Sequence, residues 1–102
     1  MDENRLRGLL GLCVRAGQAA FGETGCRKAL EGGTARLLLL DERAAENTRK
    51  RYESLCRRSD VTMRLLPAGL LEEATGRDAI AMVLRGGSLA DQVIGCLNAD
   101  GR

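Results

Sequence analysis

The sequence predicts an α/β fold, a three-layer α/β/α sandwich around a small mixed sheet of about four strands. Helical apolar spacing alternates along the chain with short apolar runs bounded by turn residues, which is typical of this class. Hydrophobic residues make up 44% and charged residues 29% of the 102 residues, a balance that indicates a globular chain. At this length we expect a single domain, placed at residues 1–97, and a frayed tail over residues 98–102.

The first helix is predicted from the apolar residues of positions 6–14, which recur at spacings of three and four. Asp2 or Asn4 can cap its start, because their side chains accept hydrogen bonds from free helix amides. Gly17 stands where a left-handed residue commonly ends a helix.

A short strand and a second helix follow. Residues 19–21 are read as the strand, and Gly22 marks the turn into a helix that runs to about Glu31 and stops at two glycines. Residues 35–40 then form an apolar run broken only by Arg36. A short apolar run between turn signals is typical of a strand buried on both faces.

A third helix is predicted over about residues 45–59. Its inner stripe consists of Thr48, Tyr52, Leu55, Cys56 and Ser59. Residues 61–66 alternate between polar and apolar, which indicates a half-buried strand.

The last third of the chain repeats the alternation. Pro67 is expected to open a short helix that ends at Gly76. Residues 79–84 form another buried strand, and residues 88–91 have the form of a capping box, with Asp91 in place of the usual Glu, before the last helix.

Composition limits the classes of function. Aromatic residues are only 2% of the chain, which disfavours a surface on which bases stack. The formal net charge is only +2, so the distribution of charge matters more than its sum. Basic residues gather at residues 27–28, 49–51 and 57–58, and this pattern fits either a binding patch or the solvated faces of helices.

The chain has four cysteines and no histidine. The cysteines never form a C-x-x-C pair, so we expect buried free thiols and no metal. Cys26 lies near a helix start, where its pKa is either lowered by the helix or governed by packing. No signal-peptide or membrane-spanning pattern occurs, which predicts a cytoplasmic protein without membrane contact.

Residues 21–30 are the most informative segment. A glycine turn leads into an amphipathic helix that places Arg27 and Lys28 in its first turns. Free amides at a helix start bind anions, and Lys28 can reach a second oxygen of the same anion. The segment is not a nucleotide-binding P-loop, because Arg27 precedes the lysine and Ala29 follows it. The other interpretation is an ordinary turn with a solvated Arg-Lys pair.

An enzyme is the less favoured class. Without histidine there is no Cys-His or Ser-His pair, so we expect no catalytic activity and no cofactor. Asp41 and Glu42 follow a buried strand and are either a base or cation site, or acids of a turn.

The order of these pieces resembles one known family along nearly the whole chain. The matching segments are Leu9–Leu12 with Arg15–Gly17, Gly22–Glu23 with Lys28–Leu30, Leu37–Asp41, Ala45–Lys50, and a helix ending at Gly76 before an apolar strand. The chain is similar to the kink-turn RNA-binding ribosomal proteins, which include archaeal large-subunit protein seven and eukaryotic large-subunit protein thirty, and most of all to their bacterial YlxQ-type branch.

The resemblance implies a site at the start of the second helix. The family's signature there is Gly-x-Asn-Glu-x-x-Lys, and it falls on Gly22, Thr24, Gly25 and Lys28. Thr24 stands in place of Asn and Gly25 in place of Glu, so two base-reading side chains of the family differ here. Arg77, followed by Asp78, stands in place of an apolar loop that covers an extruded nucleotide in the family.

The resemblance therefore implies a non-catalytic protein that binds structured RNA of ribosomal, messenger or regulatory origin, with altered motif specificity. We expect a monomer, with ribosome-associated proteins as further partners. Asn47 and Thr48 either contact this RNA or start the third helix. The alternative function is a protein-interaction module on the same fold, associated with the translation or transcription machinery.

Overall fold

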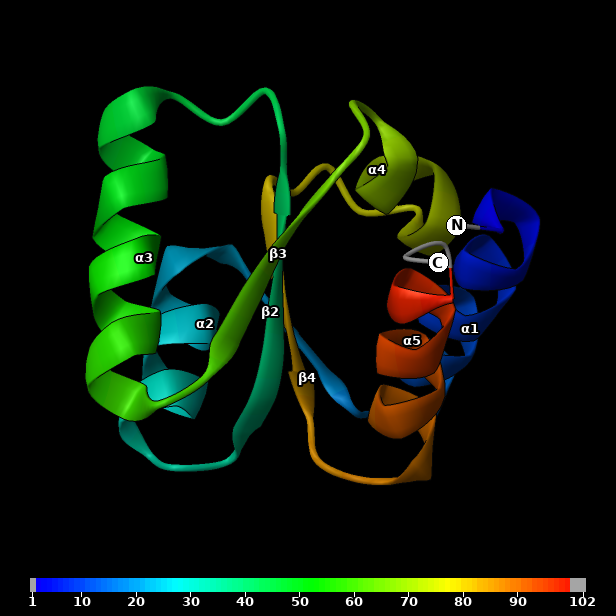
Figure 1. Cartoon of the computed structure of the whole chain (residues 1–102), viewed down its shortest axis with the longest axis horizontal. Helices are drawn as coiled ribbons and strands as arrows, with labels where there is room; N and C mark the ends of the chain where they lie inside the picture. The colour runs from blue at the N-terminus through cyan, green and yellow to red at the C-terminus, as the bar shows by residue number, and fades with distance from the viewer. Residues whose placement is uncertain (1, 100–102) are drawn as a thin grey trace.

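Helices and strands alternate throughout residues 2–99, the part of the chain that the computed structural model describes (Figure 1). The elements are α1 (Glu3–Arg15), β1 (Ala19–Phe21), α2 (Gly22–Glu31), β2 (Ala35–Asp41), α3 (Glu46–Ser59), β3 (Thr62–Leu66), α4 (Leu70–Thr75), β4 (Ala81–Arg85) and α5 (Ser88–Asn98). Within these residues, no helix is both long and apolar enough to cross a membrane.

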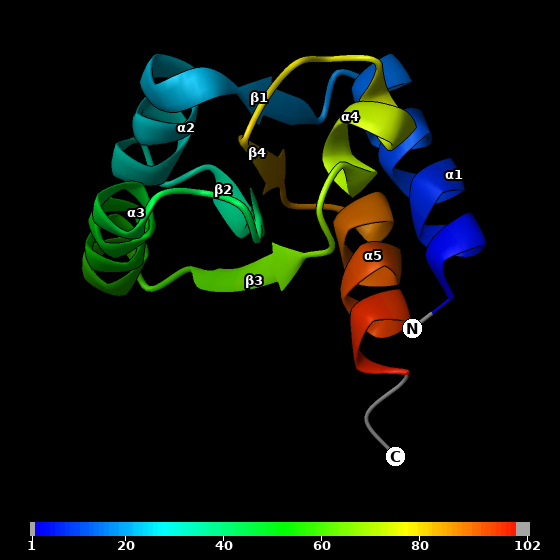
Figure 2. The same cartoon turned by 90° about the horizontal axis from the view of Figure 1, so that it is seen from above.

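The strands form one mixed sheet in the order β1-β4-β2-β3. β4 is antiparallel to both β1 and β2, whereas β2 and β3 are parallel. In the register of the central pairs, Leu38 lies opposite Val83 of β4 and Met63 of β3. Helices α2 and α3 cover one face of the sheet, and α1, α4 and α5 cover the other (Figures 1 and 2). The predicted three-layer sandwich is confirmed.

Strand β2 divides the core into two halves. Leu37 and Leu39 belong to the cluster under α1, α4 and α5, while Leu38 and Leu40 belong to the cluster under α2 and α3. All four side chains are at most 1% exposed. Successive side chains of a strand point to opposite faces, so an unbroken apolar run is what a strand between two helical layers requires. The prediction of a strand buried on both faces is confirmed.

Most predicted helix ends are confirmed. The Asp2 carboxylate accepts a hydrogen bond from the Arg5 amide at 3.1 Å, so Asp2 rather than Asn4 caps α1. Gly17 and Gly76 follow α1 and α4 with φ of +71° and +72°, the left-handed conformation that glycine adopts without strain.

The predicted capping box at Ser88 is wrong. Gly87 occupies the N-cap position, and Ser88 is already the first helical residue. The flexible glycine lets the chain turn one residue early, which leaves the serine hydroxyl past the cap position. Asp91 instead lies 3.7 Å from the Arg36 guanidinium.

Three predicted boundaries also shift. Helix α4 begins at Leu70 after Gly69, whose φ is +80°, rather than at Pro67. Strand β4 begins at Ala81, not at residue 79. The tail does not begin at residue 98, because Asn98 is the last residue of α5 and its side chain accepts a hydrogen bond from Arg64 at 2.7 Å. Residues 100–102 of the predicted tail lie outside the described residues.

Candidate functional site

The start of α2 is open. β1 ends at Phe21, whose extended backbone serves as the N-cap without a side-chain hydrogen bond. Gly22 then turns the chain with φ of +76°, and Gly22, Glu23 and Thr24 are exposed. The amides of the first helical turn are therefore not satisfied by a capping side chain, which leaves donors and the positive end of the helix dipole available to an anion.

Three segments that are distant in sequence meet beside this helix start. They line a surface hollow of about 310 Å³, which we call the α2 hollow. Its lining comes from the start of α2, the β2–α3 loop with the first turns of α3, and the start of β4: Gly22, Glu23, Arg43, Ala44, Ala45, Thr48, Arg51, Tyr52, Ile80 and Ala81. The fold thus surrounds the open helix start with both basic and apolar side chains.

A second hollow of about 290 Å³ lies further along α2 and includes Thr24 and Lys28. Glu23 lines both hollows. Lys28 is exposed, and among residues 2–99 no carboxylate forms an ion pair with it. Lys28 lies in the last turn of α2, and not in its first turns as the sequence predicts, because the helix ends at Glu31 after only ten residues.

Gly25 lies apart from these residues. It lines neither hollow, and a Cβ built on it would meet the Cβ of Ala20 in β1 at 3.7 Å. Of the residues matched to the signature, Gly22 lines the first hollow, Thr24 and Lys28 line the second, and Gly25 faces the sheet.

Arg77 approaches the end of β1 from the loop after α4. Its guanidinium carbon lies 4.8 Å from the centroid of the Phe21 ring, a cation–π arrangement. Figure 2 shows this loop crossing beside β1 on its way to β4. The Phe21 backbone is the N-cap of α2, whereas its ring packs against the core cluster under α1, α4 and α5, so Arg77 lies on the sheet face opposite to α2.

The ion pairs around Glu23 were not predicted. Its carboxylate lies 3.2 Å from Arg27 of the same helix and 3.3 Å from Arg51 of α3. Glu23 and Arg27 are four residues apart on one helix, which is a readable signal. Arg51 is 28 residues away, and only the packing of α2 against α3 brings it there.

Asp41 is a turn acid rather than a base. Its side chain is 1% exposed and accepts hydrogen bonds from the amide and guanidinium of Arg43 and from the Gly69 amide. The Arg43 hydrogen bonds hold the pKa of Asp41 at about 2. Its neighbour Glu42 accepts a hydrogen bond from the Ala68 amide at 3.1 Å. Both acids tie the β2–α3 loop to the β3–α4 loop.

The remaining predictions concern the third helix and the cysteines. Asn47 and Thr48 lie in the first turn of α3, and Thr48 also lines the α2 hollow. All four cysteines are buried free thiols, and burial raises the pKa of Cys26 to about 11, so packing and not the helix governs it. Within residues 2–99, no three Cys, Asp or Glu side chains are grouped so as to hold a metal ion.

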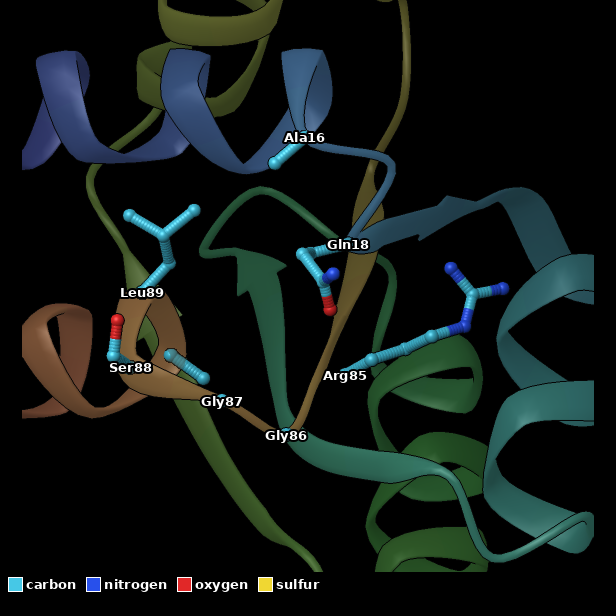
Figure 3. A pocket seen from close by; sticks show the side chains of 8 residues that line it. Ala16, Gln18, Arg85, Gly86, Gly87, Ser88 and Leu89 are labelled. Carbon is cyan, nitrogen blue, oxygen red and sulfur yellow. The ribbon is translucent and has the colours of Figure 1, made fainter.

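A further hollow of about 160 Å³ lies at the start of α5 (Figure 3). It is lined by residues of the α1–β1 turn and of the β4–α5 connection: Ala16, Gln18, Arg85, Gly86, Gly87, Ser88, Leu89 and Ala90. Figure 3 shows the Arg85 side chain directed away from Ser88 and Leu89, and its guanidinium donates to the Gly17 carbonyl at 3.2 Å. The guanidinium of Arg85 is thus engaged with the α1–β1 turn and not with the first residues of α5.

Comparison with known proteins shows a similar fold and does not bear on function. No protein-family model and no curated protein matches the chain. Among solved structures, a Bacillus halodurans protein described as having unknown function is similar, with a TM-score of 0.84 and 22% sequence identity over 91% of this chain and 96% of that chain. A likeness at this identity concerns the backbone arrangement, and function has to be argued from the site.

Proposed function

We propose that this protein is a non-catalytic structured-RNA-binding protein of the ribosomal kink-turn-binding type. The observation that carries the proposal is the open start of α2, where the first amides are uncapped and Gly22 is exposed. Lys28 adds an exposed ammonium group in the last turn of the same helix. Amides at a helix start are suited to one phosphate group, and a cation further along the helix is suited to another phosphate of the same polyanion. The resemblance of the whole chain to the kink-turn-binding family agrees with this location.

The surroundings of the helix start also support RNA. Arg77 over Phe21 adds a cation at the end of β1, on the sheet face covered by α1, α4 and α5. Helix α3 has five basic residues against two glutamates, and Arg51 of this set lines the α2 hollow. A polyanion can contact several such cations at once, which a small anion cannot.

The bound RNA motif is proposed to differ from that of the signature-bearing relatives. Phosphate contacts give affinity, whereas side chains that reach base edges give specificity. Thr24 has one hydroxyl and Gly25 has no side chain, so the bidentate contacts of Asn and Glu cannot form here. We therefore propose tight, salt-sensitive binding to bent RNA with relaxed selection for the tandem sheared G·A pairs.

A filter-binding titration across structured RNAs tests the proposal. The set comprises a kink-turn RNA, the same RNA with its sheared pairs replaced by Watson–Crick pairs, and a plain hairpin, each measured at several salt concentrations. Bent RNA should bind more tightly than the plain hairpin, and affinity should fall as salt rises. Binding no stronger than that of an unrelated protein with the same net charge would refute RNA binding.

The alternative is a protein-interaction module associated with the translation or transcription machinery. Gly25, which turns toward Ala20 rather than toward the hollows, is the observation that favours it. Affinity purification from cells separates the two proposals. Recovery of one stoichiometric protein after RNase treatment would favour the module, and RNase-sensitive recovery of ribosomal material would favour RNA.

The proposal extends to the state of the protein in the cell. We propose a cytoplasmic monomer that needs no cofactor or metal for binding. Ribosome-associated proteins are its proposed further partners, met through the shared RNA.

A further inference from the structure

Two guanidinium groups from different helices converge on the carboxylate of Glu23. Arg51 of α3 forms a fork on it, with Nη2 3.3 Å from Oε1 and Nε 3.3 Å from Oε2. Arg27 of α2 adds a third contact, with Nη2 3.2 Å from Oε2. The carboxylate thus lies between two arginines that the fold, and not the local sequence, brings together.

This arrangement has the chemistry of a phosphate site. The planar guanidinium donates two parallel hydrogen bonds, and it pairs with phosphate oxygens in the same way as with carboxylate oxygens. A point where two arginines already hold one anion therefore suits another anion of similar shape and greater charge.

The anion now held there is easy to displace. The side chains of Glu23, Arg27 and Arg51 are 50%, 45% and 46% exposed. Exposed ion pairs contribute little net free energy, because water solvates the separated partners well. Glu23 can therefore swing into solvent when a phosphate group takes its place.

The position of the cluster connects it with the open helix start. Glu23 lines both the α2 hollow and the neighbouring hollow that contains Thr24 and Lys28. A polyanion that contacts the amides of α2 would place another of its phosphates within reach of Arg27 and Arg51.

We infer that Arg27 and Arg51 form a second phosphate-binding site, which the Glu23 carboxylate occupies in the free protein and an RNA phosphate takes over on binding. The RNA source rests on the proposed function, whereas the site itself does not. Glu23 then weakens RNA binding, because its carboxylate competes with phosphate for the same two guanidiniums. The strength of this competition determines how much the site contributes to RNA affinity.

The first experiment measures RNA affinity against salt for wild type and Glu23→Gln. Removing the competing charge should tighten binding roughly threefold and steepen the salt dependence by about one phosphate contact. Glu53→Gln is the matched control, since it also removes a glutamate from an ion pair, here with Arg49 at 3.6 Å. Equal gains in the two variants would mean a general charge effect and would overturn the inference.

Arginine variants provide the converse measurement. Arg51→Gln should weaken RNA binding and lower the salt slope by about one contact. Arg57→Gln removes the same charge from an exposed position of the same helix and should change the slope less. An equal effect of both variants would contradict a defined site.

A second experiment does not depend on RNA. Inorganic pyrophosphate is titrated into wild type and Glu23→Gln while the Arg Nε–H signals are followed by NMR. Saturable shifts of the Arg27 and Arg51 signals, larger in Glu23→Gln, support the site even if no RNA binds. Absence of such shifts, or shifts spread evenly over all arginines, would overturn it. RNA binding without these shifts would leave the proposed function intact and remove only this site.

Discussion

The guanidinium of Arg43 forms a fork on the carboxylate of Asp41, with Nε 3.0 Å from Oδ1 and Nη2 2.7 Å from Oδ2. The Gly69 amide donates to the same carboxylate at 3.0 Å. A buried carboxylate with these partners is held in its charged form. It therefore fixes the β2–α3 loop, which lines the α2 hollow, to the loop that precedes α4.

The stability of the protein should depend on this carboxylate at low pH. The pKa of Asp41 is lowered from 3.8 to about 2, so its contribution is complete above about pH 4 and is lost as pH falls toward 2. The shift corresponds to about 2 kcal/mol of unfolding free energy. Asp41→Asn should lose about this amount at neutral pH and show a flatter decline below pH 4, measured by urea denaturation at several pH values.

Glu42→Gln is the control for Asp41→Asn. Glu42 is exposed and accepts a single backbone hydrogen bond, so its variant should keep the steep acid dependence of wild type. Parallel pH profiles for wild type and Asp41→Asn would show that the Asp41–Arg43 pair does not couple folding to pH.

The cysteine thiols should be unreactive in the folded protein. All four are buried, and burial raises the pKa of both Cys26 and Cys56 to about 11. Thiolate is the reactive form, so both burial and pKa slow the reaction with thiol reagents. At pH 8, a thiol reagent should label the cysteines no faster than the protein unfolds, and it should label them rapidly in denaturant. Rapid labelling of Cys26 under native conditions would contradict its position in the core.

The fold could be predicted because its signals are local. The unbroken run Leu37–Leu40 needs two covered faces, and the left-handed glycines after α1 and α4 end those helices through their own backbone freedom. The order of strands could not be predicted from such signals. That β4 pairs with both β1 and β2 depends on contacts between segments far apart in the chain.

The candidate site likewise combines features that neighbouring residues predict with features that only tertiary contacts create. The uncapped start of α2 follows from local residues, because Phe21 and Gly22 offer no capping side chain. The end of this helix at Glu31, which puts Lys28 in its last turn, was also marked locally by two glycines. The ion pair between Glu23 and Arg51 and the stacking of Arg77 on Phe21 join residues of separate elements. The direction of Gly25 toward Ala20 likewise depends on how α2 packs on β1. These relationships need tertiary structure.

Gly22→Ala should destabilise the protein. Its φ of +76° is unfavourable for a residue with a Cβ, although no heavy atom lies within 4 Å of the added carbon. The backbone cost is about 1–2 kcal/mol of unfolding free energy. Gly95→Ala in α5 also meets no atom but lies in a regular helix, so it should stabilise the protein by about 1 kcal/mol. Thermal or urea unfolding measures both. A neutral Gly22→Ala would mean that the turn relaxes readily.

Lys28→Ala should weaken binding to every RNA by a similar factor. A phosphate contact adds affinity without sequence preference, so the salt slope should fall by about one while relative affinities stay unchanged. Arg36→Ala removes the same charge from the start of β2 and is the control, since Arg36 lines neither hollow at α2. An equal loss in both variants would indicate nonspecific attraction.

Thr24→Asn should restore discrimination in favour of kink-turn RNA. Thr24 shares a hollow with Lys28, and an amide there can form the bidentate base contact that a hydroxyl cannot. One good contact is worth about 1–3 kcal/mol, measured as the change in the affinity ratio between kink-turn RNA and the variant with Watson–Crick pairs. Gly25→Glu should add less, because this position faces Ala20. Gly8→Glu, at an exposed position of α1, controls for the added charge. If the ratio stays constant in Thr24→Asn, base edges are not read at this helix start, and the resemblance to the signature has no counterpart in binding.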